Sequence, residues 1–203
     1  MRTRAAGVLK AAALGYLLGT LPSADIAARL ASGGHVDLRV HGSGNPGGAN
    51  AKQVLGSKWG YAVMAADIGK GGIASIAGAA LGGGLGAHVA GTASVLGHCF
   101  PVWNGFRGGK GVACSVGQAA ITFPAYFPVD LGVAALTSKG PFKSRAFAAT
   151  TVASTTWVAA AFLWWRKGWP NLWGPKPTIA LPAAAAASSA VIMYKFAKAR
   201  TPS

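Results

Sequence analysis

The most constraining feature of the sequence is a series of long apolar stretches that recur along its 203 residues. Charged residues make up 11% of the chain, against about 25% in an ordinary soluble domain. So few charges cannot cover a soluble globule of this size, and 52% apolar residues exclude a disordered chain. Apolar stretches of this length are typical of transmembrane helices. The sequence therefore predicts an all-α, polytopic membrane protein.

The apolar stretches predict about seven transmembrane helices within a single integral-membrane domain, residues 1–203. The first stretch resembles a signal peptide, but several further apolar segments follow it, so we interpret it as the first span. Gly82-Gly83-Gly84 forms a short uncharged turn between the second and third spans. The predicted spans cover residues 5–30, 59–81, 85–103, 111–123, 125–138, 146–165 and 179–196.

Residues 112–138 leave the number of spans open, because Pro124 and Pro128 interrupt this apolar segment. One crossing gives six spans and divides the loop cations nine against eight, whereas a fold-back gives seven spans and twelve against five. Cytoplasmic loops carry an excess of Lys and Arg. The charge distribution therefore favours seven spans, with the N-terminus outside and the Gly-rich loops in the cytoplasm. Two helices within 27 residues are each shorter than the ~20 residues of a full span, so they need neighbouring helices around them.

The first Gly-rich loop, residues 31–58, contains seven glycines and the stretch His-Gly-Ser-Gly-Asn-Pro-Gly-Gly-Ala-Asn at residues 41–50. Glycines let backbone N–H groups turn onto an anion and let that anion approach closely. Ser43, Asn45 and Asn50 add side-chain donors, and Lys52 adds a positive charge. The pattern suits a phosphate group, although the same composition is also typical of a flexible linker.

The second Gly-rich loop, residues 104–111, ends in Gly-Gly-Lys-Gly directly before an apolar segment. Free N–H groups at a helix start, together with the Lys110 ammonium, can bind phosphate. The sequence is not a P-loop, which needs G-x-x-x-x-G-K-[ST] after a strand, and a basic turn that satisfies the positive-inside rule is the alternative. Because two predicted spans separate the two loops, both face the same aqueous side and can form one anion site.

Three further residues inside or beside the spans are candidates for function. Asp67 and Lys70 are spaced three apart, on one face of the second predicted span. Charges within a span are functional candidates, or they pair with each other. His98 is a candidate proton acceptor or a hydrogen-bonded core histidine. We predict no metal site, since neither cysteine has a second Cys or His at zinc-ligand spacing.

Most of the candidate residues belong to four motifs: Gly42-Ser43-Gly44-Asn45-x-Gly47-x-x-Asn50, Asp67-x-x-Lys70-Gly71, Gly97-His98-x-Phe100-Pro101 and Gly108-Gly109-Lys110-Gly111. In this order they resemble the motifs of the integral-membrane, acyl-phosphate-dependent glycerol-3-phosphate acyltransferases, the PlsY family. The resemblance runs from about Tyr16 to Val116 and more loosely to the end. It implies a bacterial, seven-span enzyme of the cell membrane with no metal or coenzyme. It also implies the reaction: a fatty acyl group moves from acyl phosphate to the 1-hydroxyl of glycerol 3-phosphate, giving lysophosphatidic acid for phospholipid biosynthesis.

The resemblance implies that Ser43 acts in catalysis or substrate positioning and that Lys110 binds phosphate, while His98 matches the histidine of the same motif as Lys110. We therefore predict Ser43, Lys110 and His98 as the catalytic group. The predicted substrate-binding residues are Gly42, Gly44, Asn45, Gly47, Asn50, Lys52, Asp67, Lys70, Gly108, Gly109 and Gly111.

Two departures from the family pattern leave other functions open. Gln53 stands where the family has an arginine, with Lys52 beside it, and an arginine fork grips phosphate better than a lysine does. Phe196 falls at the position of the family's C-terminal histidine. The alternatives are a divergent non-catalytic homologue or a membrane transporter of a small phosphorylated anion. Nucleic acid is not an expected partner, because the cations are scattered among the spans.

Overall fold

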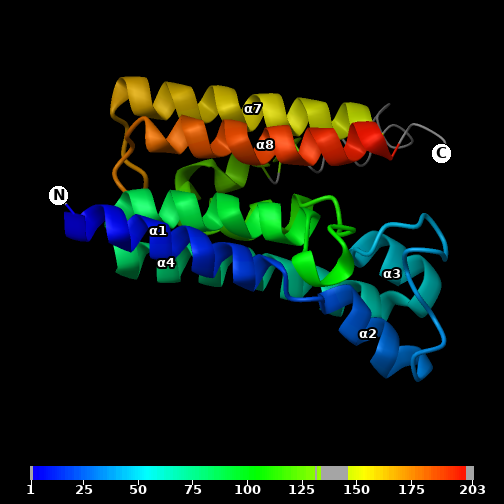
Figure 1. The fold of residues 1–203 in the computed structure, drawn as a ribbon. Helices are drawn as coiled ribbons and strands as arrows, with labels where there is room; N and C mark the ends of the chain where they lie inside the picture. The colour runs from blue at the N-terminus through cyan, green and yellow to red at the C-terminus, as the bar shows by residue number, and fades with distance from the viewer. Residues whose placement is uncertain (1, 131, 134–145, 200–203) are drawn as a thin grey trace.

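The structure is a computed structural model that describes residues 2–130, 132–133 and 146–199 (Figure 1). All regular structure in these residues is helical, which confirms the predicted all-α fold class. Two short 3-10 helices, Val102–Asn104 and Pro124–Tyr126, lie in the connections. The α-helices are α1 (Arg2–Gly19), α2 (Ser23–Ser32), α3 (Gly48–Leu55), α4 (Ser57–Cys99), α5 (Val112–Thr122), α7 (Ala146–Lys167) and α8 (Ala180–Lys198).

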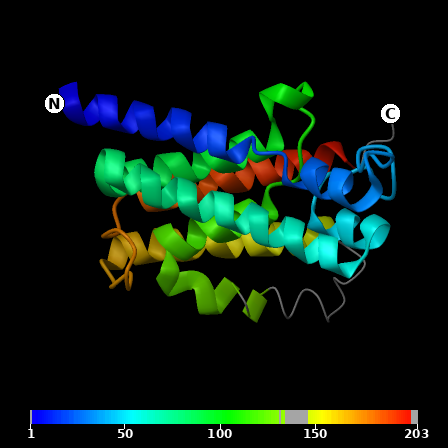
Figure 2. The ribbon, with the colours of Figure 1, turned by 90° about the horizontal axis from the view of Figure 1, so that it is seen from below.

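Helix α4 is a hairpin of two antiparallel limbs, as Figure 2 shows. The turn lies at Gly82 and Gly83, whose backbone is not helical, and Gly83 has a φ of +63° that favours glycine. A Cβ atom at Gly78 would overlap the carbonyl oxygen of Gly86, and the reverse also holds. The two limbs therefore touch backbone to backbone, which small residues allow in membrane helices. This confirms the uncharged turn predicted between residues 81 and 85.

The predicted first span, residues 5–30, is divided between two helices. Helix α1 ends at Gly19, and α2 begins at Ser23 after Pro22 and departs from the axis of α1 (Figure 1). Proline disfavours helical backbone at the residue before it, which explains the break. Residues 4–32 still qualify together, by length and composition, as one candidate membrane span.

The segment after α5 bends sharply. Val112–Thr122 and Pro124–Asp130 meet at 112°. The bend supports the fold-back at Pro124–Pro128 over a single crossing. Most of the second half of the predicted span 125–138 lies outside the described residues, at 131 and 134–138.

The helices run roughly side by side, so the connections between them lie at the two ends of the bundle (Figures 1 and 2). The start of α1 and the α7–α8 connection lie at one end (Figures 1 and 2). Both Gly-rich loops and the C-terminal end of α8 lie at the other. The seven-span alternative predicts the same arrangement, because it places the N-terminus on one side and both Gly-rich loops and the C-terminus on the other. Apolar side chains also cover the outer surface, where Ile73 and Ile76 are each 57% exposed. The protein is a multi-pass membrane protein, whose lipid-facing helices carry such side chains.

Candidate functional site

The first Gly-rich loop is organised around the side chain of Asn50, which is 2% exposed. Its Oδ1 accepts the Ser43 N–H at 2.8 Å, and its Nδ2 donates to the carbonyls of Leu38 and His41, each at 2.9 Å. Gly42, within this turn, has a φ of +62°, in the left-handed region that glycine tolerates. The loop is therefore a fixed turn at the start of α3 and differs from the flexible-linker alternative.

The second Gly-rich loop is held against the end of α4 by backbone hydrogen bonds. The N–H of Gly108 donates to the Cys99 carbonyl at 3.2 Å, and that of Gly109 donates to the His98 carbonyl at 3.1 Å. A Cβ atom at Gly109 would overlap His98 Nε2 and approach the carbonyl oxygen of Pro46 at 3.1 Å. Gly109 thus lies between the His98 imidazole and the first loop, and the two loops meet there.

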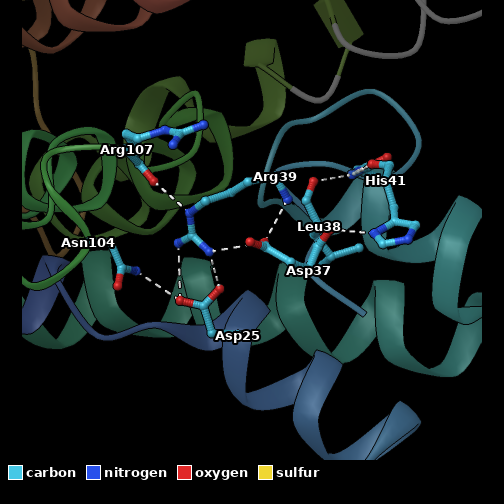
Figure 3. A network of polar contacts seen from close by, with 8 residues as sticks. Asp25, Asp37, Leu38, Arg39, His41, Asn104 and Arg107 are labelled. Carbon is cyan, nitrogen blue, oxygen red and sulfur yellow. Dashed lines mark hydrogen bonds and ion pairs between the residues drawn. The ribbon is translucent and has the colours of Figure 1, made fainter. Parts of the chain in front are cut away.

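A second junction between the loops is the ion pair of Arg39 and Asp25, drawn in Figure 3. Asp25 comes from α2 and Arg39 from the first loop. Arg39 Nε donates to the Arg107 carbonyl at 3.0 Å, and Asn104 Nδ2 donates to Asp25 Oδ2 at 2.8 Å. Hydrogen bonding to Asp25 raises the pKa of Arg39 above its already high ordinary value. The sequence analysis did not predict this ion pair. One signal was present: the chain has four aspartates and no glutamate, so each acidic residue is a candidate for a specific structural or functional role.

Asp67 and Lys70 form a buried ion pair, with 2.9 Å between Asp67 Oδ1 and Lys70 Nζ. Lys70 also donates to the Leu21 carbonyl at 3.0 Å, and Ser23 Oγ donates to Asp67 Oδ1. The geometry favours the alternative in which the two charges pair with each other. Their predicted substrate-binding roles stay predictions. His98 Nδ1 lies 3.5 Å from Asp67 Oδ1, longer than an ordinary hydrogen bond.

A small cleft opens where these groups meet, between α1, α2 and the two loops. The cations Arg39 and Lys70 both reach it, but each is already paired with a carboxylate. Its lining includes Arg39, Lys70, His98, Asn104, Gly108 and Gly109.

The Lys110 ammonium has a different partner: it lies over the Phe196 ring of α8, 4.4 Å from the ring centroid. Burial lowers the pKa of Lys110 below its ordinary value. In the described part of the chain, no carboxylate lies within ion-pair distance of this ammonium. Its charge is therefore available to an anion.

The predicted catalytic group is only partly assembled. His98 contacts the second loop at Gly109, and the Ser43 backbone is fixed by Asn50. Within residues 2–130 and 146–199, no hydrogen bond or ion pair joins the side chains of Ser43, His98 and Lys110 to one another. Lys52, predicted to bind substrate, donates to the Tyr61 hydroxyl at 3.2 Å.

An apolar cavity of about 200 Å³ lies next to the second loop, between α5, α7 and α8. It begins at Val112, two residues after Lys110, and includes Ile192, one helical turn before Phe196. Trp157, Tyr126 and Asp130 contribute to its wall. The cavity is smaller than a usual ligand pocket of about 300–1,000 Å³, so it has room for part of an alkyl chain and not for a whole one.

The helices and the converging loops define an integral membrane protein with a polar site at one end of its bundle and an apolar cavity beside it. Residues 9–200 match the family model described as glycerol-3-phosphate acyltransferase. The chain belongs to the glycerol-3-phosphate acyltransferase family.

Individual relatives agree with the family match. The glycerol-3-phosphate acyltransferase of Exiguobacterium sibiricum is 45% identical over 118 residues, which cover 58% of this chain and 56% of that protein. That of Bacillus subtilis is 43% identical over 114 residues, 56% of this chain and 58% of that protein. The alignments thus span little more than half the length of these curated relatives.

Two solved structures of PlsY (YgiH), an integral membrane glycerol 3-phosphate acyltransferase, have a similar fold. The glycerol 3-phosphate form superposes with a TM-score of 0.72 at 28% identity, and covers 94% of this chain and 88% of that chain. The lysophosphatidic acid form gives the same TM-score at 26% identity.

Proposed function

We propose that this protein transfers a fatty acyl group from acyl phosphate to the 1-hydroxyl of glycerol 3-phosphate and so forms lysophosphatidic acid for phospholipid biosynthesis. One observation carries the proposal: the two Gly-rich loops meet at Gly109, directly before a lysine whose charge has no carboxylate partner among the described residues. Family membership supports an acyltransferase over a transporter. The forms in which the PlsY structures were solved support the acceptor and the product.

The chemistry needs positioning more than a strong nucleophile. The 1-hydroxyl oxygen attacks the acyl carbonyl carbon, an ester C–O bond forms, and the bond between that carbon and the phosphate oxygen breaks. The hydroxyl proton leaves to the departing phosphate or to His98. Holding the two anionic substrates together can lower the barrier by ~7–11 kcal/mol. Donors aimed at the developing oxyanion lower it further.

Each loop has a role in this scheme. Lys110 neutralises phosphate, with the first N–H groups of α5, directly after the second loop, as further donors. Ser43 orients the attacking hydroxyl or the leaving phosphate. Asp67 faces Nδ1 of His98, and Nε2 is directed to the second loop, where a proton can be accepted.

The apolar cavity beside Lys110 receives part of the acyl chain. Its walls belong to α5, α7 and α8, so an acyl phosphate bound there presents its head group to the second loop. We infer that both Gly-rich loops face the cytoplasm of a bacterial cell and that the N-terminus lies outside. The basis is the excess of Lys and Arg at the loop end of the bundle. The chain forms one integral-membrane domain in this proposal.

The test is a direct assay of the detergent-purified protein with palmitoyl phosphate and glycerol 3-phosphate, in which phosphate release and lysophosphatidic acid are followed together. We expect product from the wild type and at least a ten-fold loss in Lys110→Ala. Lys176→Ala is the matched control, since this exposed lysine lies in the α7–α8 connection at the opposite end of the bundle. Absence of product from folded wild-type protein would contradict the proposal and favour the non-catalytic homologue.

A further inference from the structure

Three cations near the loop end of the bundle are held in two different ways. Arg39 and Lys70 are each paired with a carboxylate, at 2.6 Å from Asp25 and 2.9 Å from Asp67. Lys110 instead lies over an aromatic ring. A carboxylate cancels the charge of the cation it holds, whereas a ring attracts the cation through its quadrupole and leaves the net charge in place. Only the second arrangement keeps a cation both fixed and available to an anion.

The backbone on both sides of Lys110 is fixed by packing. Gly109 lies against His98 and Pro46, where no side chain fits. Gly111 has a φ of +89°, and a Cβ atom there would lie 2.8 Å from Cys99 Sγ and 3.2 Å from Ile192 Cγ1. With both neighbours fixed, the only freedom left to the lysine is in its side-chain torsions, and the partner of the ammonium decides where the charge lies.

The ring is itself a rigid surface. Phe196 is 9% exposed and belongs to the buried cluster of Val95, Cys99, Cys114 and Ile192. The preceding residue, Lys195, donates to the Cys99 carbonyl at 3.0 Å and so ties α8 to the end of α4. The end of α8 is thereby held against the residue whose carbonyl also accepts the Gly108 N–H.

We propose that Phe196 is a positioning residue for Lys110: its ring face holds the ammonium beside the second Gly-rich loop, so that the positive charge is presented to a substrate phosphate. The expected kinetic effect rests on the proposed function, whereas the contact between Lys110 and Phe196 rests on the geometry alone. It also gives a role to the residue that departs most from the family pattern. Contacts of this kind correspond to about a 2- to 30-fold change in an equilibrium constant.

The kinetic test compares Phe196→Leu, which keeps an apolar side chain without a ring, with Phe196→Tyr, which keeps the ring. We expect Phe196→Leu to raise KM by about 2- to 30-fold, with a smaller change in kcat. The affected substrate should be the one whose KM also rises in Lys110→Ala. Phe196→Tyr should stay close to the wild type. In a Lys110→Ala background, Phe196→Leu should have no further effect on KM. Phe162→Leu, at a half-exposed ring on α7, is the control for a general effect of the substitution.

A binding test separates this inference from the proposed function. Acetylation of Lys110 is followed by mass spectrometry in the intact protein, with inorganic phosphate as the protecting anion. We expect phosphate to protect Lys110 in the wild type, and about 2- to 30-fold more phosphate to be needed in Phe196→Leu. If the wild type makes no lysophosphatidic acid but phosphate still protects its Lys110 better than that of Phe196→Leu, the proposed function is wrong and the positioning role of Phe196 stands. Equal protection in both proteins, no protection in either, or a Tyr variant as impaired as the Leu variant would overturn the positioning role.

Discussion

Asp25 and Arg39 form a two-point ion pair, with 2.6 Å between Arg39 Nη1 and Asp25 Oδ1 and 3.1 Å between Nη2 and Oδ2. The third guanidinium nitrogen, Nε, donates to the Arg107 carbonyl of the second loop. One arginine of the first loop therefore holds α2 and the second loop at the same time. A planar fork with several donors in fixed directions is what this junction requires.

Arg39→Lys should weaken this junction, because the three donors of an ammonium share one nitrogen and cannot match the separated positions of the two Asp25 oxygens and the Arg107 carbonyl. We expect a loss of about 1–2 kcal/mol in stability, from hydrogen bonds to a charged group that are partly exposed. The acyl-transfer rate should fall with it, since the loops would separate. Thermal unfolding in detergent and the initial rate measure the two effects. Arg29→Lys, an exposed arginine of α2, is the control, and an equal effect there would contradict this role for Arg39.

Asn50→Asp should be more damaging than its small change in shape suggests. Asn50 Nδ2 donates to two carbonyls, of Leu38 and His41, and a carboxylate oxygen in its place would face them without a proton. Leaving buried acceptors unpaired and burying a charge costs about 2–4 kcal/mol. We expect a clear fall in the unfolding temperature and loss of activity. Ala49→Ser, at the exposed neighbouring position, should leave both unchanged. A stable Asn50→Asp protein would show that this amide does not organise the loop.

The helical composition and the Gly82 turn could be predicted from the sequence because they depend on local properties. A long apolar stretch has few alternatives to a membrane helix, and three consecutive glycines interrupt one. The break at Pro22 was missed because apolar residues continue through it as far as Leu30. Hydropathy measures how apolar a segment is and says little about its direction, and a change of direction between α1 and α2 costs nothing in apolar content.

The candidate site was predictable where a residue's role is local and unpredictable where it depends on distant partners. The turn around Asn50 follows from a Gly-Ser-Asn pattern, but the pairing of Asp25 with Arg39 joins residues of different elements. The Lys110–Phe196 contact spans 86 positions in the chain, so spacing rules cannot find it. In the sequence, Phe196 is notable only because the family has a histidine at this position. The structure shows that its ring contacts the Lys110 ammonium.

Gly109→Ala tests the contact between the loops. The added Cβ would overlap His98 Nε2 and press on the Pro46 carbonyl, so the imidazole or the loop has to move. Such overpacking costs about 1–3 kcal/mol, and a comparable loss in transition-state stabilisation would slow acyl transfer about 5- to 160-fold. The control is Gly69→Ala in α4, where nothing lies within 4 Å of the new Cβ. That variant should be as stable as the wild type or more so by about 0.5–1 kcal/mol. A Gly109→Ala enzyme of normal rate would argue against a close approach there.

Asp67 and Lys70 offer a test between pairing and substrate binding. Removing one partner, in Lys70→Met, leaves a buried carboxylate without its cation and should destabilise the protein by about 3–5 kcal/mol. The double variant Asp67→Asn/Lys70→Met removes both charges and should recover much of that stability. If the pair is structural, the double variant also regains acyl transfer. A stable but inactive double variant would instead support the predicted substrate-binding role, and the unfolding temperature with the initial rate distinguishes the two results.

The pH dependence of kcat/KM should report the ammonium of Lys110. Burial disfavours its charged form and lowers its pKa from the ordinary 10.5, so the alkaline decline in kcat/KM begins below the pH at which an exposed lysine titrates. Lys110→Arg should move the decline to higher pH, because a guanidinium keeps its charge throughout.

The contribution of Lys110 to stability changes with pH in the direction opposite to its contribution to activity. Titration of Lys110 can therefore be distinguished from unfolding of the protein. With a folded-state pKa below the unfolded one, the unfolded chain binds more protons between the two values, so this contribution rises with pH as activity falls. Unfolding free energies of the wild type and of Lys110→Arg across that window isolate it from the other lysines. If kcat/KM and stability declined together with pH in the wild type, and did so equally in Lys110→Arg, the limb would reflect loss of structure and not the titration of Lys110.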